Sequence, residues 1–157
     1  MLFVGVDPGF SGAIAVVDGN ARALGAVKLK ETEHDIWEWM LKELGLHGDH
    51  FAVLEKVGAM PRQGLSSTFK FGHSYGFCRG LLVANQITFE AVTPLKWQVK
   101  MGCKSGGDKK VTKAAAQRLF PNVKMTHAVA DAYLLAEYAR RIWCERVTNG
   151  GGNRVDR

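Results

Sequence analysis

Three acidic residues lie in apolar surroundings, where a solvated carboxylate is not expected. Asp7 ends the apolar run "FVGVD", Glu55 follows "FAVL", and Asp131 lies within "HAVADAYLLA". A carboxylate near a core is costly unless it is paired or binds a cation. Carboxylates that gather within a few ångströms also repel one another unless cations neutralise them. The pattern therefore indicates either a divalent-cation site or a group that performs acid–base chemistry.

Each acid also has a simpler structural interpretation, which the sequence leaves open. Asp7 before Pro8-Gly9 could be a turn residue, Glu55 could pair with a lysine, and Asp131 could be one charge on a helix. The joint pattern favours a cluster, because most other acids lie in polar stretches. Two divalent ions about 3.5–4 Å apart can clamp both oxygens of an in-line phosphoryl displacement. Acids at a centre with lysines around them predict a nuclease that uses Mg²⁺ or Mn²⁺, two ions per site.

His127 is a fourth candidate metal ligand. It precedes Asp131 by four residues, so the two share a face if this segment is helical. A lone histidine near a helix start is more often structural, whereas beside a metal cluster it can be a ligand or a proton carrier. Both interpretations of His127 stay open.

The distribution of charge indicates a polyanionic partner. The chain carries a net charge of +6. Between Glu55 and Asp131 the only acids are Glu90 and Asp108, against twelve lysines and arginines. A long segment of one sign favours nucleic acid. The alternative is a solvated face whose counter-charges come from the acidic segment 31–43.

Turn residues and hydrophobic periodicity predict the order of the elements. Strands are expected at 2–7, 12–18 and 22–29, because Pro8-Gly9 and Gly19-Asn20 separate them with turns too short for anything but an antiparallel meander. A helix ending near Gly45, a strand at 51–57, a helix at 65–86 and a strand at 87–92 follow. Three helices complete the chain: a short one after the N-cap Thr93, one from Asp108 to Phe120, and one over 126–146.

This order places the acids together if the fourth strand lies beside the first. Asp7 and Glu55 would then sit at adjacent strand ends, and a helix packed on that edge would bring in Asp131. The helix at 65–86 is expected to have Ser66 or Ser67 near its N-cap. Its glycines at 72, 76 and 80 share one face and indicate close approach to another backbone, either inside the monomer or in a second copy of the chain.

Length and composition favour one α/β domain over residues 1–147, with a flexible polar tail at 148–157. No apolar run is long enough to span a membrane, and the N-terminus lacks the features of a signal peptide. The three cysteines have no metal-ligand spacing, so they are expected to be reduced thiols in an intracellular protein. No small-molecule cofactor is expected.

The ordered motifs resemble those of RuvC-type Holliday junction resolvases, especially the small phage and prophage members. The matching stretches are "GVDPGFSGAIAVVD", "FAVLEKV", "MPRQGLSSTFKFGHSYGFCRGLLVA", "VTPLKWQ", "GGDKKVTKAAAQRLFP" and "HAVADAYLLAEYARR". The resemblance implies a ribonuclease H-like α/β fold: a five-stranded mixed sheet, formed by a three-strand antiparallel meander plus two parallel strands, with helices on both faces.

The resemblance also implies the site residues. The catalytic carboxylates would be Asp7, Glu55 and Asp131, with Ala128 at the family's fourth position and His127 beside it. The two active-site lysines correspond best to Lys96 and Lys109. The expected DNA-binding residues are polar or basic side chains of the central segment: Arg62, Ser67, Lys70, Lys96, Lys100, Lys104, Lys109, Lys110 and Lys113.

The implied activity is metal-dependent resolution of four-way DNA junctions by paired cuts that leave 5′-phosphate ends. A two-fold homodimer would make such cuts most simply, in the cytoplasm or nucleoid of a bacterial or phage-infected cell. Two alternatives stay open: a ribonuclease H acting on RNA–DNA hybrids, and a non-catalytic protein that binds branched DNA. An actin-like kinase would need two such domains, and this chain is too short.

Overall fold

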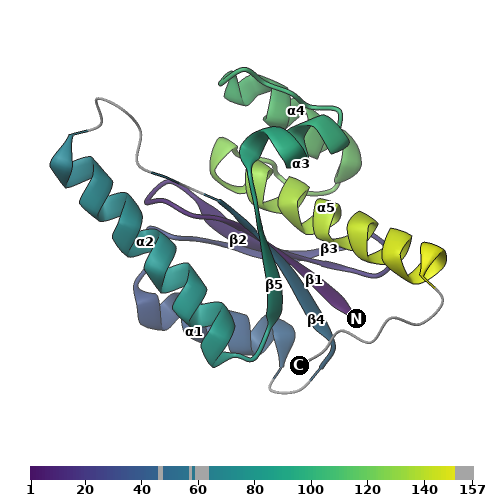
Figure 1. Ribbon diagram of the computed structural model, residues 1–157, viewed down its shortest axis with the longest axis horizontal. Coiled ribbons are helices and arrows are strands. Elements are labelled where there is room, and N and C mark those ends of the chain that lie inside the picture. Colours follow the sequence, from purple (N-terminus) through teal and green to yellow (C-terminus); the bar gives the residue numbers. More distant parts are fainter. Residues whose placement is uncertain (46–47, 57, 59–63, 151–157) are drawn as a thin grey trace.

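The computed structural model describes residues 1–45, 48–56, 58 and 64–150. Its centre is a five-stranded sheet in the order β3-β2-β1-β4-β5 (Figure 1). The strands are β1 (Leu2–Asp7), β2 (Ala13–Asp18), β3 (Ala23–Lys28), β4 (His50–Glu55) and β5 (Thr88–Val92). The first three form an antiparallel meander, whereas β4 and β5 run parallel to β1. The expected mixed sheet is therefore confirmed.

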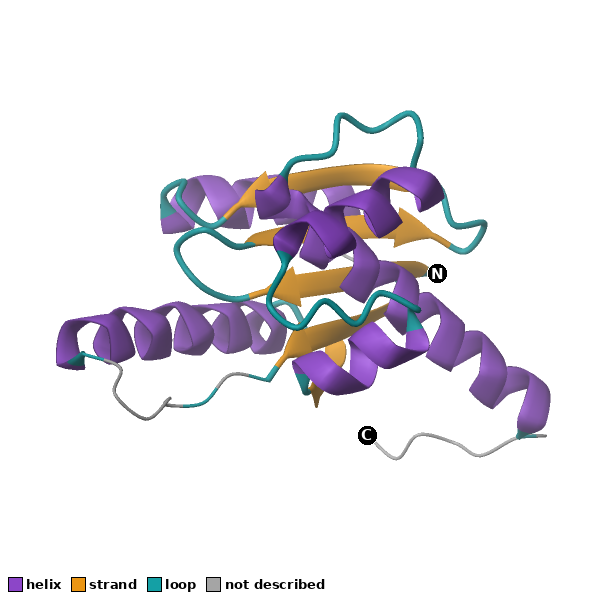
Figure 2. Ribbon diagram, turned by 90° about the horizontal axis from the view of Figure 1, so that it is seen from above, coloured by secondary structure: helices purple, strands orange, loops and turns teal. Residues whose placement is uncertain are grey.

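Helices cover both faces of this sheet (Figures 1 and 2). One face carries α1 (Glu33–Leu44) and α2 (Leu65–Ala84), and the other carries α3 (Pro94–Lys100), α4 (Lys109–Leu119) and α5 (His127–Asn149). Side chains alternate between the two faces along a strand. In β1, Phe3 accordingly packs with the α5 side and Val4 with the α1 side. The sequence thus builds two cores on one sheet, which is the ribonuclease H-like arrangement.

The ends of several helices follow local capping chemistry. Thr32 accepts a hydrogen bond from the Asp35 backbone at 3.1 Å and starts α1. Asp108 accepts one from the Lys110 backbone at 2.9 Å and starts α4, as the sequence predicts. Ser66 and Ser67 lie in the first turn of α2, near its N-cap as expected, and the N-cap residue itself is Gly64.

The end of the last helix refines the sequence-based expectations. The helix α5 runs to Asn149, two residues into the segment expected to be a tail, and residues 151–157 lie outside the described part.

None of the helices in the described ranges combines the length and hydropathy that crossing a membrane requires.

Candidate active site

Asp7 and Glu55 end two neighbouring parallel strands. The register pairs Val6 of β1 with Leu54 of β4, so Asp7 and Glu55 are the next residues on each strand. In both strands the four central residues are buried, and the chain becomes partly exposed again at these acids. The sheet therefore brings two carboxylates from residues far apart in sequence to one edge.

Asp131 reaches the same edge because α5 lies directly against β1. A Cβ atom at Gly5 would overlap the backbone of Ala132 and Ala136, so only glycine allows the strand and the helix to come this close. Asp131 directly precedes Ala132 and lies near the start of α5. The helix start thus delivers the third carboxylate to the strand ends.

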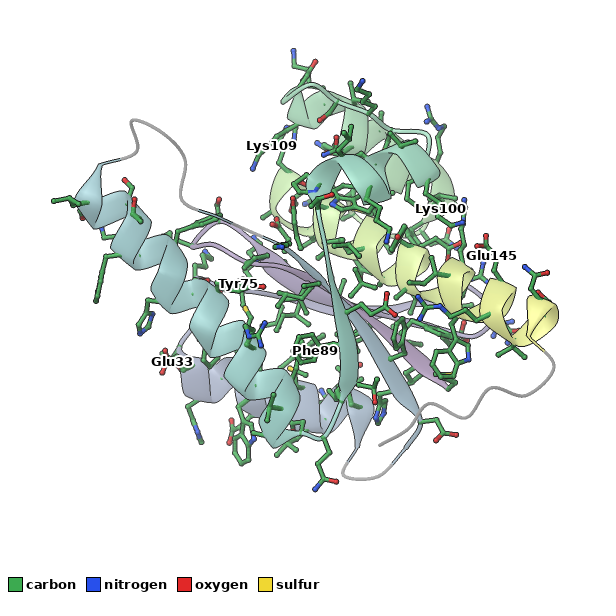
Figure 3. The ribbon with its side chains drawn as sticks, in the orientation of Figure 1. Glu33, Tyr75, Phe89, Lys100, Lys109 and Glu145 are labelled. Atoms are coloured by element: carbon green, nitrogen blue, oxygen red, sulfur yellow. The ribbon has the colours of Figure 1, made fainter. Side chains whose placement is uncertain are left out.

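The three acids line one pocket of about 380 Å³. Its wall is formed by the β1–β2 loop, Phe71 of α2 and Lys109 of α4. Figure 3 shows Lys109 at the start of α4, away from Lys100 and Glu145, which lie together where α3 meets α5. A larger cavity of about 860 Å³ lies at the opposite ends of the strands, near His50 and Thr88, and Asp49 is its only acid among the described residues. The smaller pocket is therefore the candidate active site.

The pKa values of all three carboxylates are raised, mainly by burial. Burial, followed by the charges of Glu55 and Asp131, raises the pKa of Asp7 well above its usual range. Burial and the charge of Asp131 raise the pKa of Glu55 to about 7. Burial also raises the pKa of Asp131. Lys109 opposes all three shifts, because its positive charge lowers each of these pKa values. A cluster of carboxylates with raised pKa values is typical of functional sites.

The donor set fits a hard divalent cation. Asp7, Glu55 and Asp131 offer only oxygen ligands, which Mg²⁺ and Mn²⁺ prefer. The Oδ1 atom of Asp131 is buried and has no hydrogen-bond partner among the described residues, and a buried oxygen of this kind needs a partner. In the described ranges, however, no three His, Cys, Asp or Glu side chains are placed closely enough together to hold a metal ion as they stand.

The structure separates the other predicted site residues. His127 is the first residue of α5 and is exposed; it does not line the pocket, although its charge lowers the pKa of Asp131. Lys96 is exposed on α3. Lys100 binds Glu145 of α5 at 2.7 Å, so its charge is engaged within the molecule.

The remaining predicted DNA-binding residues occupy two regions. Ser67 and Lys70 are exposed near the start of α2. Lys104 lies in the loop before α4, and Lys110 and Lys113 lie on α4 itself. Arg62 lies outside the described residues. The structure thus places basic groups on both sides of the pocket, on α2 and on α4.

Two polar residues at the site were missed by the sequence reasoning. The Ser74 hydroxyl of α2 accepts a hydrogen bond from the Gly9 backbone at 3.0 Å and holds the loop after Asp7. Thr112 of α4 is buried. Its hydroxyl lies 3.3 Å from the Lys109 carbonyl, and its hydrogen bond to Asp131 lowers the pKa of that acid; with a single proton, the hydroxyl donates to one of these two oxygens at a time. The only signal of these two residues in the sequence is helical spacing: Ser74 follows Ser67 by seven residues, and Thr112 follows Lys109 by three.

Comparison with known proteins shows that the fold of this chain is similar to that of solved structures. No protein-family model and no curated protein matches the sequence. Among solved structures, the chain is similar to Thermus thermophilus RuvC in complex with a Holliday junction substrate, with a TM-score of 0.61 and 15% identity over 90% of this chain and 96% of that one. A structure of Thermus thermophilus RuvC gives a TM-score of 0.59 and 16% identity over 91% and 97%. This chain therefore has the ribonuclease H-like fold found in RuvC, along nearly its whole length.

Proposed function

We propose that this chain is a divalent-metal-dependent endodeoxyribonuclease that resolves four-way DNA junctions. The observation that carries the proposal is the meeting of Asp7, Glu55 and Asp131 with Lys109 in one pocket, on a fold shared with RuvC. Three buried carboxylates with raised pKa values are costly to keep ionised without partners, and bound cations would remove that cost. A basic segment beside them suits a DNA backbone.

Asp7, Glu55 and Asp131 would hold the cations, with His127 as a candidate for a fourth position. Bound divalent ions supply an activated water and neutralise charge on the phosphate. Lys109 stands beside the carboxylates and would stabilise the negative charge that develops on the phosphate oxygens. Thr112 would keep Asp131 in place relative to Lys109, because its hydroxyl reaches both residues.

The exposed face of α2 supports a two-fold dimer in this function. Leu65, Phe69 and Val83 are 90%, 76% and 64% exposed. A Cβ atom at Gly72, Gly76 or Gly80 would meet no atom within 4 Å, so these glycines do not serve packing among the described residues of one chain. An apolar helix face with a flat glycine surface suits a second copy of the same helix. A dimer would present two pockets to the two strands that must be cut.

The deciding experiment compares three labelled substrates on one gel: a mobile four-way junction, an RNA–DNA hybrid duplex and a flap, each with Mg²⁺, Mn²⁺ or chelator. We expect symmetric cuts in the junction that require a divalent ion and leave 5′-phosphates. Asp7→Asn should abolish cutting, whereas Asp49→Asn, at the opposite strand ends, should retain it.

The other outcomes identify the alternatives. Cutting of the hybrid alone would favour a ribonuclease H. If the chain binds the junction but cuts it with neither Mg²⁺ nor Mn²⁺, a non-catalytic binding protein would be favoured. Cutting that survives Asp7→Asn would contradict the proposed mechanism for every substrate.

A further inference from the structure

The side chain of Phe10 is exposed at the rim of the candidate active site. It is 77% exposed, yet it lines the same pocket as the three carboxylates. Phenylalanine is among the residues most often buried. A single exposed apolar residue elsewhere would need no explanation, but this one lies three positions after Asp7.

The loop that carries Phe10 is held in place on both sides. The Gly9 backbone donates to Ser74 of α2 at 3.0 Å, and the Gly12 backbone donates to the Gly9 carbonyl at 2.9 Å. Gly9 has a φ of +126°, and a Cβ atom there would lie 2.9 Å from the ring of Phe71. The ring of Phe10 is therefore presented by a braced turn. A contact made by such a pre-placed ring loses little conformational entropy.

The pocket is lined by two chemically different kinds of residue. Phe10, Phe71 and Pro8 are apolar, whereas the carboxylates and Lys109 are charged. A nucleotide combines the same two kinds of surface, a flat apolar base and a charged phosphate. A phosphate bound at the charged groups would therefore have apolar side chains of the same pocket within reach of a neighbouring base.

We propose that Phe10 stacks on one unstacked nucleobase next to the phosphate that is cut; this inference rests on the proposed function. Bases inside a continuous duplex cover one another's faces, so only a base freed from its neighbour can offer a face to an aromatic ring. Branch points contain such bases. Phe10 thereby favours cutting where the helix is interrupted, without reading base identity by hydrogen bonds.

Three variants test the contact. Phe10→Ala removes the ring, Phe10→Trp keeps an aromatic face, and Val147→Ala truncates a similarly exposed side chain near the far end of α5 as a control. The substrates are the four-way junction and the same junction with an abasic analogue beside the cut, tested at each flanking position. Melting temperatures should be unchanged, since Phe10 contributes little buried surface.

The expected result is a coupling between ring and base. Base–aromatic stacking is strong enough for Phe10→Ala to slow cutting of the normal junction about tenfold. The abasic substrate should slow the wild type similarly at one flanking position, and there Phe10→Ala should cause no further loss. Phe10→Trp and Val147→Ala should cut at the wild-type rate. Equal losses on normal and abasic substrates at both positions would overturn the proposal.

A binding measurement separates this inference from the proposed function. In chelator, a junction with 2-aminopurine beside the branch point is titrated with wild type and Phe10→Ala. A difference in 2-aminopurine emission between the two complexes supports stacking even if no substrate is cut, and the same emission in both overturns it. Absence of cutting by the wild type with every metal would overturn the proposed nuclease function alone.

Discussion

The backbones of Gly5 in β1 and Ala132 in α5 lie in direct contact, with no side chain between them. Gly5 stands two residues before Asp7, and Ala132 directly follows Asp131. This contact therefore sets the separation of two proposed catalytic carboxylates. It couples the packing of the core to the geometry of the pocket.

Gly5→Ala should destabilise the protein and disturb the site. The added methyl would overlap backbone atoms, which cannot move as a side-chain tip can, so we expect a loss of about 3 kcal/mol in the free energy of unfolding. Urea denaturation checks this value. The matched control is Gly19→Ala, because its added Cβ would only reach ordinary contact with Met1 at 4.0 Å. Equal stability of the two variants would contradict the close packing of β1 and α5.

Stability without metal should fall as pH rises from about 4.5 to about 7. The pKa of Glu55 is raised from 4.5 to about 7 in the folded state, so between these values the folded chain holds more protons than the unfolded chain. The free energy of unfolding then decreases with rising pH and levels off above the folded pKa. Asp7 contributes to the same decrease in the free energy of unfolding with rising pH, because its pKa is also raised.

Denaturation in chelator at pH 5, 6, 7 and 8 measures this slope. Glu55→Gln should flatten it, because the amide does not titrate. Saturating Mg²⁺ should also flatten it, because bound cations favour the deprotonated carboxylates. An unchanged slope in Glu55→Gln would show that other groups cause the pH dependence.

Lys109→Ala should reduce the cutting rate far more than Lys100→Ala. Lys109 lines the pocket and lowers the pKa of all three acids, and loss of one well-placed electrostatic contact costs about 10²–10³ in rate. Lys100 is engaged with Glu145 at 2.7 Å, so its loss should change the rate only a few-fold. Single-turnover cutting of the junction measures the rates of both variants. Equal losses of rate in Lys109→Ala and Lys100→Ala would contradict a special role of Lys109 in the pocket.

Thr112→Val should raise the Mg²⁺ concentration that cutting requires, without unfolding the chain. The substitution keeps the shape of the buried side chain but removes the hydroxyl that contacts the Lys109 carbonyl and lowers the pKa of Asp131. Loss of a group that orients a metal ligand costs about tenfold or more in affinity or activity. The Mg²⁺ concentration for half-maximal cutting should rise accordingly. Thr112→Ser should restore the wild-type value, whereas failure of this rescue would point to packing alone.

Phe69→Glu should convert the proposed dimer to a monomer. A charge within an apolar helix face opposes burial against a second copy. Light scattering after size exclusion gives the mass, and Val147→Glu, which lies on α5, is the matched control. The monomeric variant should nick junctions without paired cuts. A monomeric wild type at the same concentration would remove the basis for the dimer.

Much of the fold could be predicted from local patterns. The meander follows from Pro8-Gly9 and Gly19-Asn20, and the start of α4 follows from the Asp108 cap. The start of α2 was predicted near Ser66 or Ser67, but the N-cap residue itself, Gly64, has no side chain that would mark it. A helix start also depends on where the preceding chain enters, and that is not a local property.

The sequence by itself determined which acids stand in apolar surroundings and which strands carry them, because burial leaves a hydrophobic pattern around each acid. Only the tertiary structure decided which partners reach them. Lys109, rather than Lys96 or Lys100, lines the pocket, and Ser74 and Thr112 meet the site from separate helices. These choices depend on how closely α5 and α4 pack over the sheet, and that distance is set by contacts such as Gly5 with Ala132, between residues remote in sequence.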